Sequence, residues 1–474
     1  MSELDLVVIG AGPAGAAAAL EAHRRGLRCL LVDEAPAAGG QVWRAPPEGF
    51  VRRKADADAK AGDRLRAELG ASSIATAFGH RVWLITESFR IEAVGSEGPV
   101  TWRAPAIIAA TGVSERVIPF PGWTEPGVIG LAGATVLLKA QQVLPGERAL
   151  VAGCGPLLPA VVASVLKAGG RVAAAVDLAE RREWLSALPA MLTRPDLLGR
   201  GLGWLIRLRR AGVPVYFRHA IRQVESAEEH LEVAIAPVDA TGRFVTEVCE
   251  RVFEVDWVAV GHGLVPGTEI TRLLGAEHRY HAERGGWVAV LDETGRTSVP
   301  GLLVAGDGGG IRGAAAAVEQ GRLAGLATAL DQGRLARDAF EREARPIRRR
   351  LRRAERFGQA SARLMAVRAG QVLSIPEETI VCRCEDVTRA EITAAIGAGA
   401  AEVNQLKGWT RCGMGPCQGR MCGEAAASLL AVATGSRDAA GIWTGRAPLR
   451  PVALDDLLGD YSYGDIPLPK AAPL

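Results

Sequence analysis

Residues 4–15 read LDLVVIGAGPAG, and this stretch decides the fold of the N-terminal part of the chain. Its first half, Leu4–Ile9, is an apolar run of the kind found in strands that are buried on both faces. Three glycines follow, at spacings that suit a tight turn between a strand and a helix. Gly10 permits the turn, Gly12 lets the backbone approach a pyrophosphate, and Gly15 lets the helix pack closely against the strand. The stretch therefore predicts a nucleotide-binding turn.

The residues that follow complete this unit. An alanine-rich segment predicts a helix that ends near Arg25, and a second apolar run, Leu27–Val32, leads to Asp33. Unpaired N–H groups at the start of the helix can bind phosphate oxygens, and the Asp33 carboxylate lies where it can accept hydrogen bonds from a ribose. Strand, glycine turn, helix, strand and acid together predict an α/β dinucleotide-binding domain.

Three further motifs decide between FAD and a nicotinamide nucleotide. Gly39-Gly40-Gln41 follows shortly after Asp33, and Ala110-Thr111-Gly112 resembles the crossover motif of flavoproteins that have two dinucleotide-binding domains. Residues 297–307 read TSVPGLLVAGD and resemble the second FAD motif of those flavoproteins, in which the aspartate contacts the ribityl and pyrophosphate region. The motifs favour FAD. The expected FAD site comprises Gly10, Gly12, Pro13, Ala14, Gly15, Asp33, Glu34, Gly40, Gln41, Ala110, Thr111, Gly112, Gly306 and Asp307.

A second unit of the same layout starts at Arg148–Ala152, but its glycine turn is altered. Leu158 occupies the position of the third glycine, and a side chain there pushes the helix away from the strand. Pro156 removes an N–H group from the start of the helix. We expect this domain to keep its fold and to lose efficient NAD(P)H binding, although another nucleotide could occupy its cleft. The first 380 residues contain no Cys-x-x-Cys pair, which excludes a disulfide-reductase mechanism.

Length, charge and hydropathy set broad limits. A chain of 474 residues predicts about three domains. The formal net charge of +3 is small for this length and argues against a chain that binds nucleic acid or membrane surfaces as a whole. The uncharged stretch 149–166 contains glycines and prolines, which indicate a strand, a turn and a helix rather than a membrane span. Because the first residues also lack the pattern of a secretory signal, we expect a cytoplasmic protein.

Five of the eight cysteines crowd together between positions 382 and 422. Such crowding in a chain without an export signal indicates a metal centre rather than disulfides. Two thiolates from a tight Cys-x-Cys loop and two from a later glycine-rich loop can enclose two irons, and the glycines can expose N–H groups to the cluster sulfurs. A Cys₄ zinc site is the rival interpretation, but zinc modules favour Cys-x₂₋₄-Cys at both ends. The pattern therefore favours a [2Fe–2S] cluster.

Residues 413–422, which read GMGPCQGRMC, carry a more specific resemblance. The cysteine-rich module resembles the bacterioferritin-associated-ferredoxin type of [2Fe–2S] domain. This version is similar to the one appended to FAD subunits of heteromeric dye-linked dehydrogenases, such as the α subunits of opine oxidase and of hydroxyproline or proline dehydrogenase, and a hydrogen cyanide synthase subunit. The similarity extends from Leu4 to about Gly423. By position, it implies Cys382, Cys384, Cys417 and Cys422 as the cluster ligands and leaves the role of Cys412 open.

The resemblance also implies an activity and partners. In that family a separate flavoprotein β subunit oxidises the amine substrate, and the subunit that resembles this chain passes electrons through FAD and the cluster to an acceptor. A small third subunit can also be present. The implied substrate is an amino acid, an imino acid or an opine. Consistent with this division of labour, the sequence offers no acid/base pair that we would assign to substrate oxidation, and the catalytic residues stay unassigned.

Five regions follow from these motifs. We expect a discontinuous FAD-binding domain (1–120 and 263–335), an inserted NAD(P)-like domain (121–262), an Arg-rich helical linker (336–376), a [2Fe–2S] domain (377–435) and a C-terminal tail (436–474).

Two of these regions are candidate surfaces for a partner subunit. The arginines of residues 345–356 predict either a solvated connecting helix or a docking surface. Their lack of interleaved aromatic residues argues against nucleic-acid binding. The tail is the second candidate, with Pro448, Pro451, Pro467 and Pro469.

Two other functions stay open on the sequence. A stand-alone NAD(P)H-dependent FAD/iron–sulfur reductase needs a working second cleft despite Leu158. A redox-sensing nucleic-acid-binding protein would use the arginine helix, but the near-neutral total charge disfavours it. His262 follows a buried strand, and we expect it to be a loop residue where the chain returns to the FAD domain.

Overall fold

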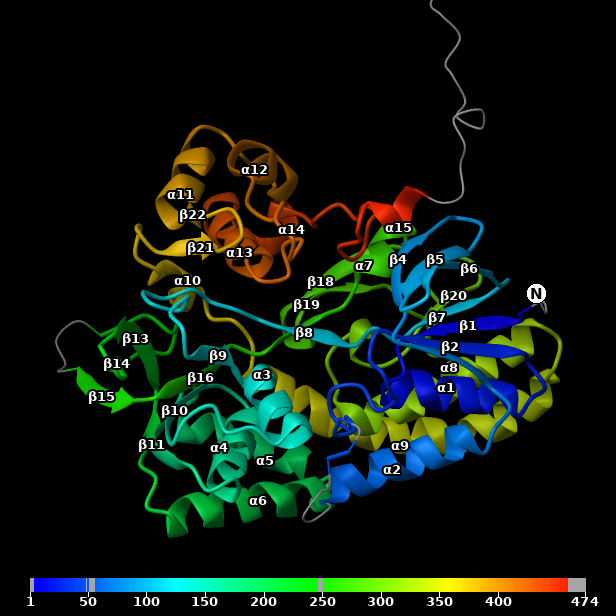
Figure 1. Ribbon diagram of the computed structural model, residues 1–474, viewed down its shortest axis with the longest axis horizontal. Helices are drawn as coiled ribbons and strands as arrows, with labels where there is room; N and C mark the ends of the chain where they lie inside the picture. Colours follow the sequence, from blue (N-terminus) through cyan, green and yellow to red (C-terminus); the bar gives the residue numbers. More distant parts are fainter. Residues whose placement is uncertain (1–3, 48, 51–55, 246–249, 459–474) are drawn as a thin grey trace, which may run out of the picture.

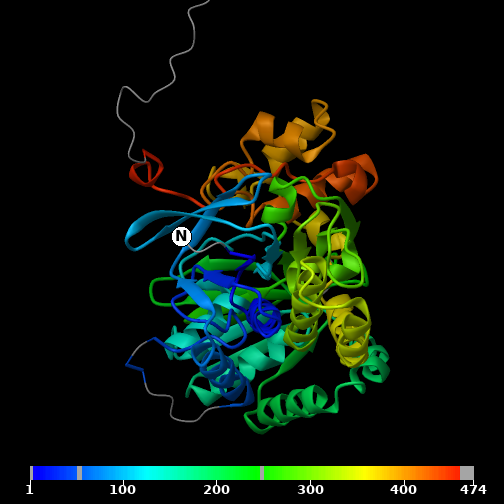
Figure 2. The same ribbon diagram turned by 90° about the vertical axis from the view of Figure 1, so that its right-hand side faces the viewer.

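The computed structural model describes residues 4–47, 49–50, 56–245 and 250–458. Two α/β domains lie side by side, and a small helical module rests on top of both (Figure 1). A view from the side places this module at one end of the molecule and helix α6 (Pro195–Arg210) at the other (Figure 2). No helix of the described residues is long and apolar enough to cross a membrane.

The first domain contains a parallel five-stranded sheet in the order β20-β7-β1-β2-β3. Its strands are short apolar runs, as expected for a sheet covered on both faces. They are β1 (Leu6–Ile9), β2 (Cys29–Asp33), β3 (Ala75–Phe78), β7 (Ile107–Ala109) and β20 (Leu302–Val304).

Small residues bring the helices of this domain close together. Helix α1 (Pro13–His23) packs against α8 (Ala314–Asp331) beneath the sheet (Figure 1). A Cβ atom at Gly321 of α8 would overlap the carbonyl oxygen of Ala14, so only glycine permits this approach. Helix α2 (Ala57–Gly70) and an antiparallel sheet of β4 (Arg81–Ile85), β5 (Arg90–Gly95) and β6 (Gly98–Arg103) complete the domain.

The second domain repeats the plan with a parallel sheet in the order β12-β11-β10-β16-β9. Strand β10 forms at the predicted Arg148–Ala152, and the uncharged stretch 149–166 is β10, the turn and α4, as expected. The strands of the sheet are β9 (Val128–Gly130), β10 (Arg148–Gly153), β11 (Arg171–Asp177), β12 (Val215–Phe217) and β16 (Trp257–Gly261). The helices are α3 (Leu131–Thr135), α4 (Leu157–Lys167), α5 (Arg181–Met191) and α6. An antiparallel sheet of β13 (His219–Ser226), β14 (Leu231–Pro237) and β15 (Arg251–Val255) covers it.

Two antiparallel strands connect the domains. Strand β8 (Val113–Glu115) leaves the first domain, and β17 (Leu264–Pro266) returns beside it. His262 lies between β16 and β17, which confirms its placement in the returning loop. Its Nδ1 lies 3.3 Å from the backbone nitrogen of Ile118, and burial together with Arg116 lowers the pKa of the ring to about 4. This histidine is therefore neutral at physiological pH and supports the loop.

The arginine-rich helix α9 (Arg337–Leu364) belongs to the folded body rather than to a free linker. Phe340, Ala344, Ile347 and Leu351 recur at helical spacing, and all four are buried in the core that also contains β1 and α8. Its C-terminal end packs against α5 of the second domain. The sequence pattern indicated the helix and its exposed arginines, but this apolar stripe was missed.

The cysteine-rich module is built from short elements around its own core. Thr388 and Glu391 form a capping box at the start of α11. The elements are α10 (Ala369–Leu373), β21 (Ile380–Cys382), β22 (Val387–Thr388), α11 (Arg389–Gly397), α12 (Val403–Thr410), α13 (Gly423–Thr434) and α14 (Arg437–Ala440). After α14 the chain returns over the first domain to α15 (Asp455–Leu458), as Figure 1 shows. Pro448 and Pro451 lie on this return, whereas Pro467 and Pro469 fall outside the described residues.

Candidate functional site

The first glycine turn has the geometry that its sequence predicts. Gly10 has φ +103°, and a Cβ atom on it would overlap the carbonyl oxygen of Ala110. A Cβ atom on Gly15 would overlap the carbonyl oxygen of Gly10, which confirms that Gly15 permits the close helix–strand packing. At Gly12 the nearest neighbour of a Cβ would be the Cα of Gly40, 3.7 Å away. Gly12 therefore faces open space at the start of α1, where a pyrophosphate can lie.

All predicted FAD residues except Gly15 line one cleft at the edge of the first sheet. Asp33 ends β2, and its carboxylate accepts hydrogen bonds from the backbone N–H groups of Ala11 and Ala35 (2.7 Å). Burial raises the pKa of Asp33 above its ordinary value, partly offset by those hydrogen bonds. The carboxylate is thus fixed at the rim of the glycine turn.

Asp307 is held in a comparable way on the opposite side of the cleft. Its Oδ1 accepts hydrogen bonds from the backbone N–H groups of Arg312 and Gly313, both at 2.8 Å. The N–H of Gly306 donates to Gln320 Oε1 at 3.1 Å. The two acids and the glycine backbone therefore form a polar, preformed cleft. It fits a dinucleotide that has a pyrophosphate, a ribose and a ribityl chain.

Some residues of the cleft could not be found from sequence motifs. Glu269 and Ile270 come from α7 (Glu269–Leu273), and Leu449 and Arg450 come from the C-terminal return. Arg450 lies 3.5 Å from Glu34 and 3.6 Å from Glu269, measured between charged atoms. No local motif marks these residues, because they reach the cleft only through the tertiary fold.

The five crowded cysteines form a single cage. The Sγ atoms of Cys382, Cys412 and Cys422 lie within 4.8 Å of one another, and all three residues are buried. Cys417 contacts Cys422 and Cys384 through side-chain hydrogen bonds, so the remaining two thiols adjoin this group. Hydrogen bonds from Cys412 and Cys422 lower the pKa of Cys382, and a hydrogen bond from Cys422 lowers that of Cys417 to about 5. The lowered pKa values of Cys382 and Cys417 favour the thiolate form that binds metal, whereas burial raises the pKa of Cys384 and contact with Cys382 raises the pKa values of Cys412 and Cys422.

Backbone N–H groups also point at these sulfurs. The N–H groups of Gly413 and Glu385 help to lower the pKa of Cys382, and those of Gly419 and Met421 help to lower the pKa of Cys417. This agrees with the expectation that the glycine-rich loop offers N–H groups to the thiols. Gly415 brings the two cysteine loops together, because a Cβ atom there would overlap the Cβ of Cys384. The donor set of thiolates and N–H groups fits an iron–sulfur cluster.

Arg420 joins the cysteine cage to the FAD cleft. It lies between Cys417 and Cys422, and its Nε donates to Glu269 Oε1 at 2.8 Å. Its other nitrogens donate to the carbonyl oxygens of Leu449 (2.7 Å) and Cys417 (3.2 Å). Although burial opposes the effect, Arg420 and Arg450 hold the pKa of Glu269 below its ordinary value. One charged side chain therefore contacts the cage, the cleft wall and the C-terminal return.

The second glycine turn is covered by the chain itself. A Cβ atom at Gly155 would lie 2.5 Å from the Cγ of Met365, the residue that ends α9. Asp177, the acid at the end of β11, accepts a hydrogen bond from Trp184 Nε1 at 2.9 Å. Leu158 is buried in the domain core, and α4 still packs on β10 and β11. The groups that would face a nucleotide thus contact α9 and α5 instead.

Comparison with known proteins agrees with this architecture. Residues 4–321 match the family described as pyridine nucleotide-disulphide oxidoreductase, and residues 380–432 match the BFD-like [2Fe-2S] binding domain. An opine oxidase subunit of Rhizobium meliloti (strain 1021) is 36% identical over 96% of this chain and 99% of its own length. Hydrogen cyanide synthase subunit HcnB of Pseudomonas aeruginosa is 34% identical over 94% of this chain and 96% of its own length.

The solved structures add evidence on the fold. A crystal structure of L-proline dehydrogenase from P. horikoshii superimposes with a TM-score of 0.67 at 21% identity, over 96% of this chain and 79% of that one. T. acidophilum thioredoxin reductase gives 0.52 at 22% identity, over 70% of this chain and 99% of that one. The chain therefore belongs to the pyridine nucleotide-disulphide oxidoreductase family, in a group that includes an opine oxidase subunit, and is an oxidoreductase that uses FAD and a [2Fe–2S] cluster.

Proposed function

We propose that the chain is the electron-transfer subunit of a heteromeric dehydrogenase that oxidises an amino acid, an imino acid or an opine. The relatives, which are named as subunits of opine oxidase and of hydrogen cyanide synthase, support this assignment. Bound FAD exchanges two electrons whereas the cluster carries one at a time, so the pair converts two-electron into one-electron chemistry. The substrate-oxidising groups belong to a partner subunit.

The observation that carries the proposal is the direct connection between the cysteine cage and the FAD cleft. Glu269 and Ile270 line the cleft, and Arg420 of the cage binds Glu269. Leu449 and Arg450 line the cleft as well, and Arg420 also binds the Leu449 carbonyl. These contacts fix the cysteine loop against the cleft wall. A chain built for electron transfer between the two centres needs such a fixed arrangement.

We also propose that Cys382, Cys384, Cys417 and Cys422 ligate the cluster, with Cys412 as a buried neighbour. The N–H groups that point at Cys382 and Cys417 support these two as thiolates. The close three-thiol group contains Cys412, however, so Cys412 and Cys384 are the positions where the assignment is most open to experiment.

The surface of the second domain supports a partner subunit. Six large aliphatic side chains are exposed on α5, directly after α5 and on α6. We call them the α5–α6 apolar face: Leu185, Leu188, Leu192, Leu202, Leu205 and Ile206. On each helix these side chains recur at helical spacing, and exposed apolar patches mark interaction sites. Helix α9 packs on α5, and its outward side carries exposed arginines such as Arg349 and Arg353. The arginine-rich helix therefore lies next to an apolar face.

Reconstitution tests the proposal. The chain is purified alone and together with its co-expressed genomic neighbours, and each preparation is assayed with an artificial dye and with proline, hydroxyproline and a panel of opines. We expect dye reduction only from the complex. Full activity from the isolated chain would show that it is an enzyme in its own right.

The NAD(P)H-reductase alternative makes a different prediction. It requires a nucleotide at the second glycine turn, where Met365 lies against Gly155 and Trp184 binds Asp177. We expect stopped-flow mixing with NADH to reduce the flavin much more slowly than the complex turns over its substrate. Fast, saturable reduction at micromolar NADH would favour the reductase.

A further inference from the structure

A second cavity lies on the other side of the FAD-cleft wall. It has a volume of about 350 Å³ and is bounded by α8, α9 and the loop between β19 (Gly286–Ala289) and β20. Gly306 lines both this cavity and the FAD cleft. None of the other predicted FAD residues lines this cavity, so it is distinct from the site described above.

Four arginines converge on the cavity: Arg284, Arg312, Arg348 and Arg352. Arg284 and Arg352 make no hydrogen bond or ion pair to a carboxylate within the described part of the chain. Arg312 is paired with Glu355, but its buried Nε has no hydrogen-bond partner. Burial and the neighbouring Arg312 together lower the pKa of Arg284, which indicates that like charges are held close in a partly desolvated place.

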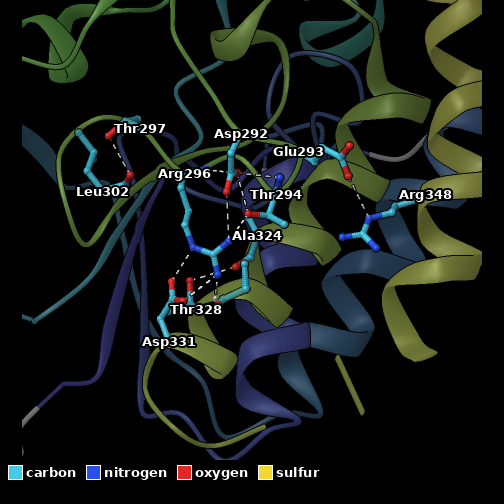
Figure 3. Close-up of polar contacts among 11 residues, drawn as sticks. Asp292, Glu293, Thr294, Arg296, Thr297, Leu302, Ala324, Thr328, Asp331 and Arg348 are labelled. Atoms are coloured by element: carbon cyan, nitrogen blue, oxygen red, sulfur yellow. Dashed lines mark hydrogen bonds and ion pairs between the residues drawn. The ribbon is translucent and has the colours of Figure 1, made fainter. Parts of the chain in front are cut away.

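Glu355, which also lines the cavity, pairs with Arg312 and attracts Arg284, but the carboxylates of Asp292 and Glu293 do little to neutralise the cavity arginines. Figure 3 shows that the carboxylate of Asp292 is turned toward Thr294 and Arg296. Its Oδ1 accepts hydrogen bonds from the N–H groups of Thr294 (2.8 Å) and Arg296 (2.9 Å), and its Oδ2 lies 3.2 Å from Arg296 Nη1. Arg296 is bound in turn by Asp331 at 2.7 Å. This network is complete in itself and directs the Asp292 carboxylate away from the cavity arginines.

Glu293 contributes little for a different reason. It reaches Arg348 across 3.7 Å, and its side chain is 85% exposed, so water screens the interaction (Figure 3). Arg348 is held more firmly by Glu341, at 2.7 Å, on the outer side of α9. The cavity therefore keeps an excess of positive charge.

The remaining wall is apolar. Leu291, Val304, Leu323 and Leu351 line the cavity from the loop, the sheet, α8 and α9. A cavity that combines a few convergent charged groups with aliphatic walls has the character of a small-molecule site. Planar guanidinium groups bind carboxylate and phosphate oxygens through paired N–H donors.

We propose that this arginine cavity binds a small organic anion, whose phosphate or carboxylate group lies against Arg284, Arg312 and Arg352 and whose apolar part lies against the four aliphatic side chains. The like charges are costly without a ligand, which is a common property of binding sites that trade stability for function. Because Gly306 separates the cavity from the FAD cleft, the anion binds beside the flavin site without entering it.

Calorimetric titration of the full chain, loaded with FAD and cluster, tests this site. FAD blocks the first cleft, so that added anions report on the arginine cavity. The probes are inorganic phosphate, phenyl phosphate, phenylacetate and, as a neutral control, benzyl alcohol. We expect phenyl phosphate to bind on the order of tenfold more tightly than phosphate, because its ring buries apolar surface, and benzyl alcohol not to bind. Phenylacetate distinguishes a carboxylate site from one that requires phosphate.

Two variants decide the matter. Arg284→Gln combined with Arg352→Gln should weaken anion binding at least tenfold, whereas Arg349→Gln, an exposed neighbour on α9, should leave it unchanged. Without anions, the double variant should unfold at a higher temperature than the native chain because repulsion is relieved. A lower unfolding temperature would mean that the arginines are structural. If no anion binds, the proposal is overturned. If the double variant binds the anions as tightly as the native chain does, the binding is that of an adventitious ion only, and the proposal is overturned as well.

Discussion

Gly12 and Gly15 belong to one turn, but substitutions at the two positions should impair the protein for different reasons. Gly12 has φ −68° and ψ −176°, which valine adopts readily, and its Cβ would point into the open cleft. Gly12→Val should therefore fold and lose FAD. Gly15→Ala should cost about 2 kcal/mol of unfolding free energy, because its Cβ overlaps Gly10. Thermal unfolding with measurement of released flavin separates the two effects. Gly70→Val, at an open helix end, is the control.

The cysteine assignment makes a second prediction for single residues. Cys417→Ser should lose the cluster, and Cys412→Ser should keep two irons and two sulfides per chain after anaerobic purification. Iron and sulfide analysis, together with visible absorption beyond the flavin bands, measures both. The opposite pattern would place Cys412 among the ligands, as its position in the close three-thiol group allows.

Gly415 tests whether the two cysteine loops must touch. Gly415→Ala should lower cluster content, because the added methyl group overlaps the Cβ of Cys384 and pushes the loops apart. Gly408→Ala in α12 has open space around it and should leave the cluster intact. Equal cluster content in both variants would mean that the loops adapt.

At the scale of elements, the contact between the cysteine loop and α7 is the most informative. Arg420→Gln keeps every thiol but removes the charged link to Glu269. We expect both cofactors to be retained and electron transfer from flavin to cluster to slow by on the order of tenfold, since small misplacements of reacting centres are costly. Stopped-flow absorption measures this rate. Arg411→Gln, an exposed pair partner of Glu385 beside the cage, is the matched control.

The position of each element along the chain explains which features of the fold and the site could be predicted from the sequence. The first glycine turn was predictable because strand, turn, helix and acid are consecutive and each glycine has a local reason. The cage was recognisable because its five cysteines are close in sequence. Arg450 at the FAD cleft and Met365 at the second turn were not, because each arrives from a distant segment. In α9 the arginines concealed an apolar stripe that includes Ile347 and Leu351.

At the scale of the whole molecule, the α5–α6 apolar face should carry the partner. Leu205→Glu with Ile206→Glu places two charges on side chains that are 54% and 43% exposed, so the chain itself should fold normally. Association with the co-expressed partner should weaken by about 2 kcal/mol or more. Size-exclusion chromatography with dye-reduction assays detects the loss. Val252→Glu, at a 61% exposed position on β15, should have no effect. Unchanged association of the double variant would direct attention to the arginines of α9.

The measurement that tests the central claim most directly is rapid-freeze electron paramagnetic resonance of the cluster after mixing with substrate. In the complex, we expect the reduced-cluster signal to appear within one turnover, and to be absent when the chain carries Gly12→Val and lacks FAD. The isolated chain, with both cofactors bound, should give no signal with the same substrate. A reduced cluster in the isolated chain at the rate of the complex would contradict the assignment of this protein as an electron-transfer subunit.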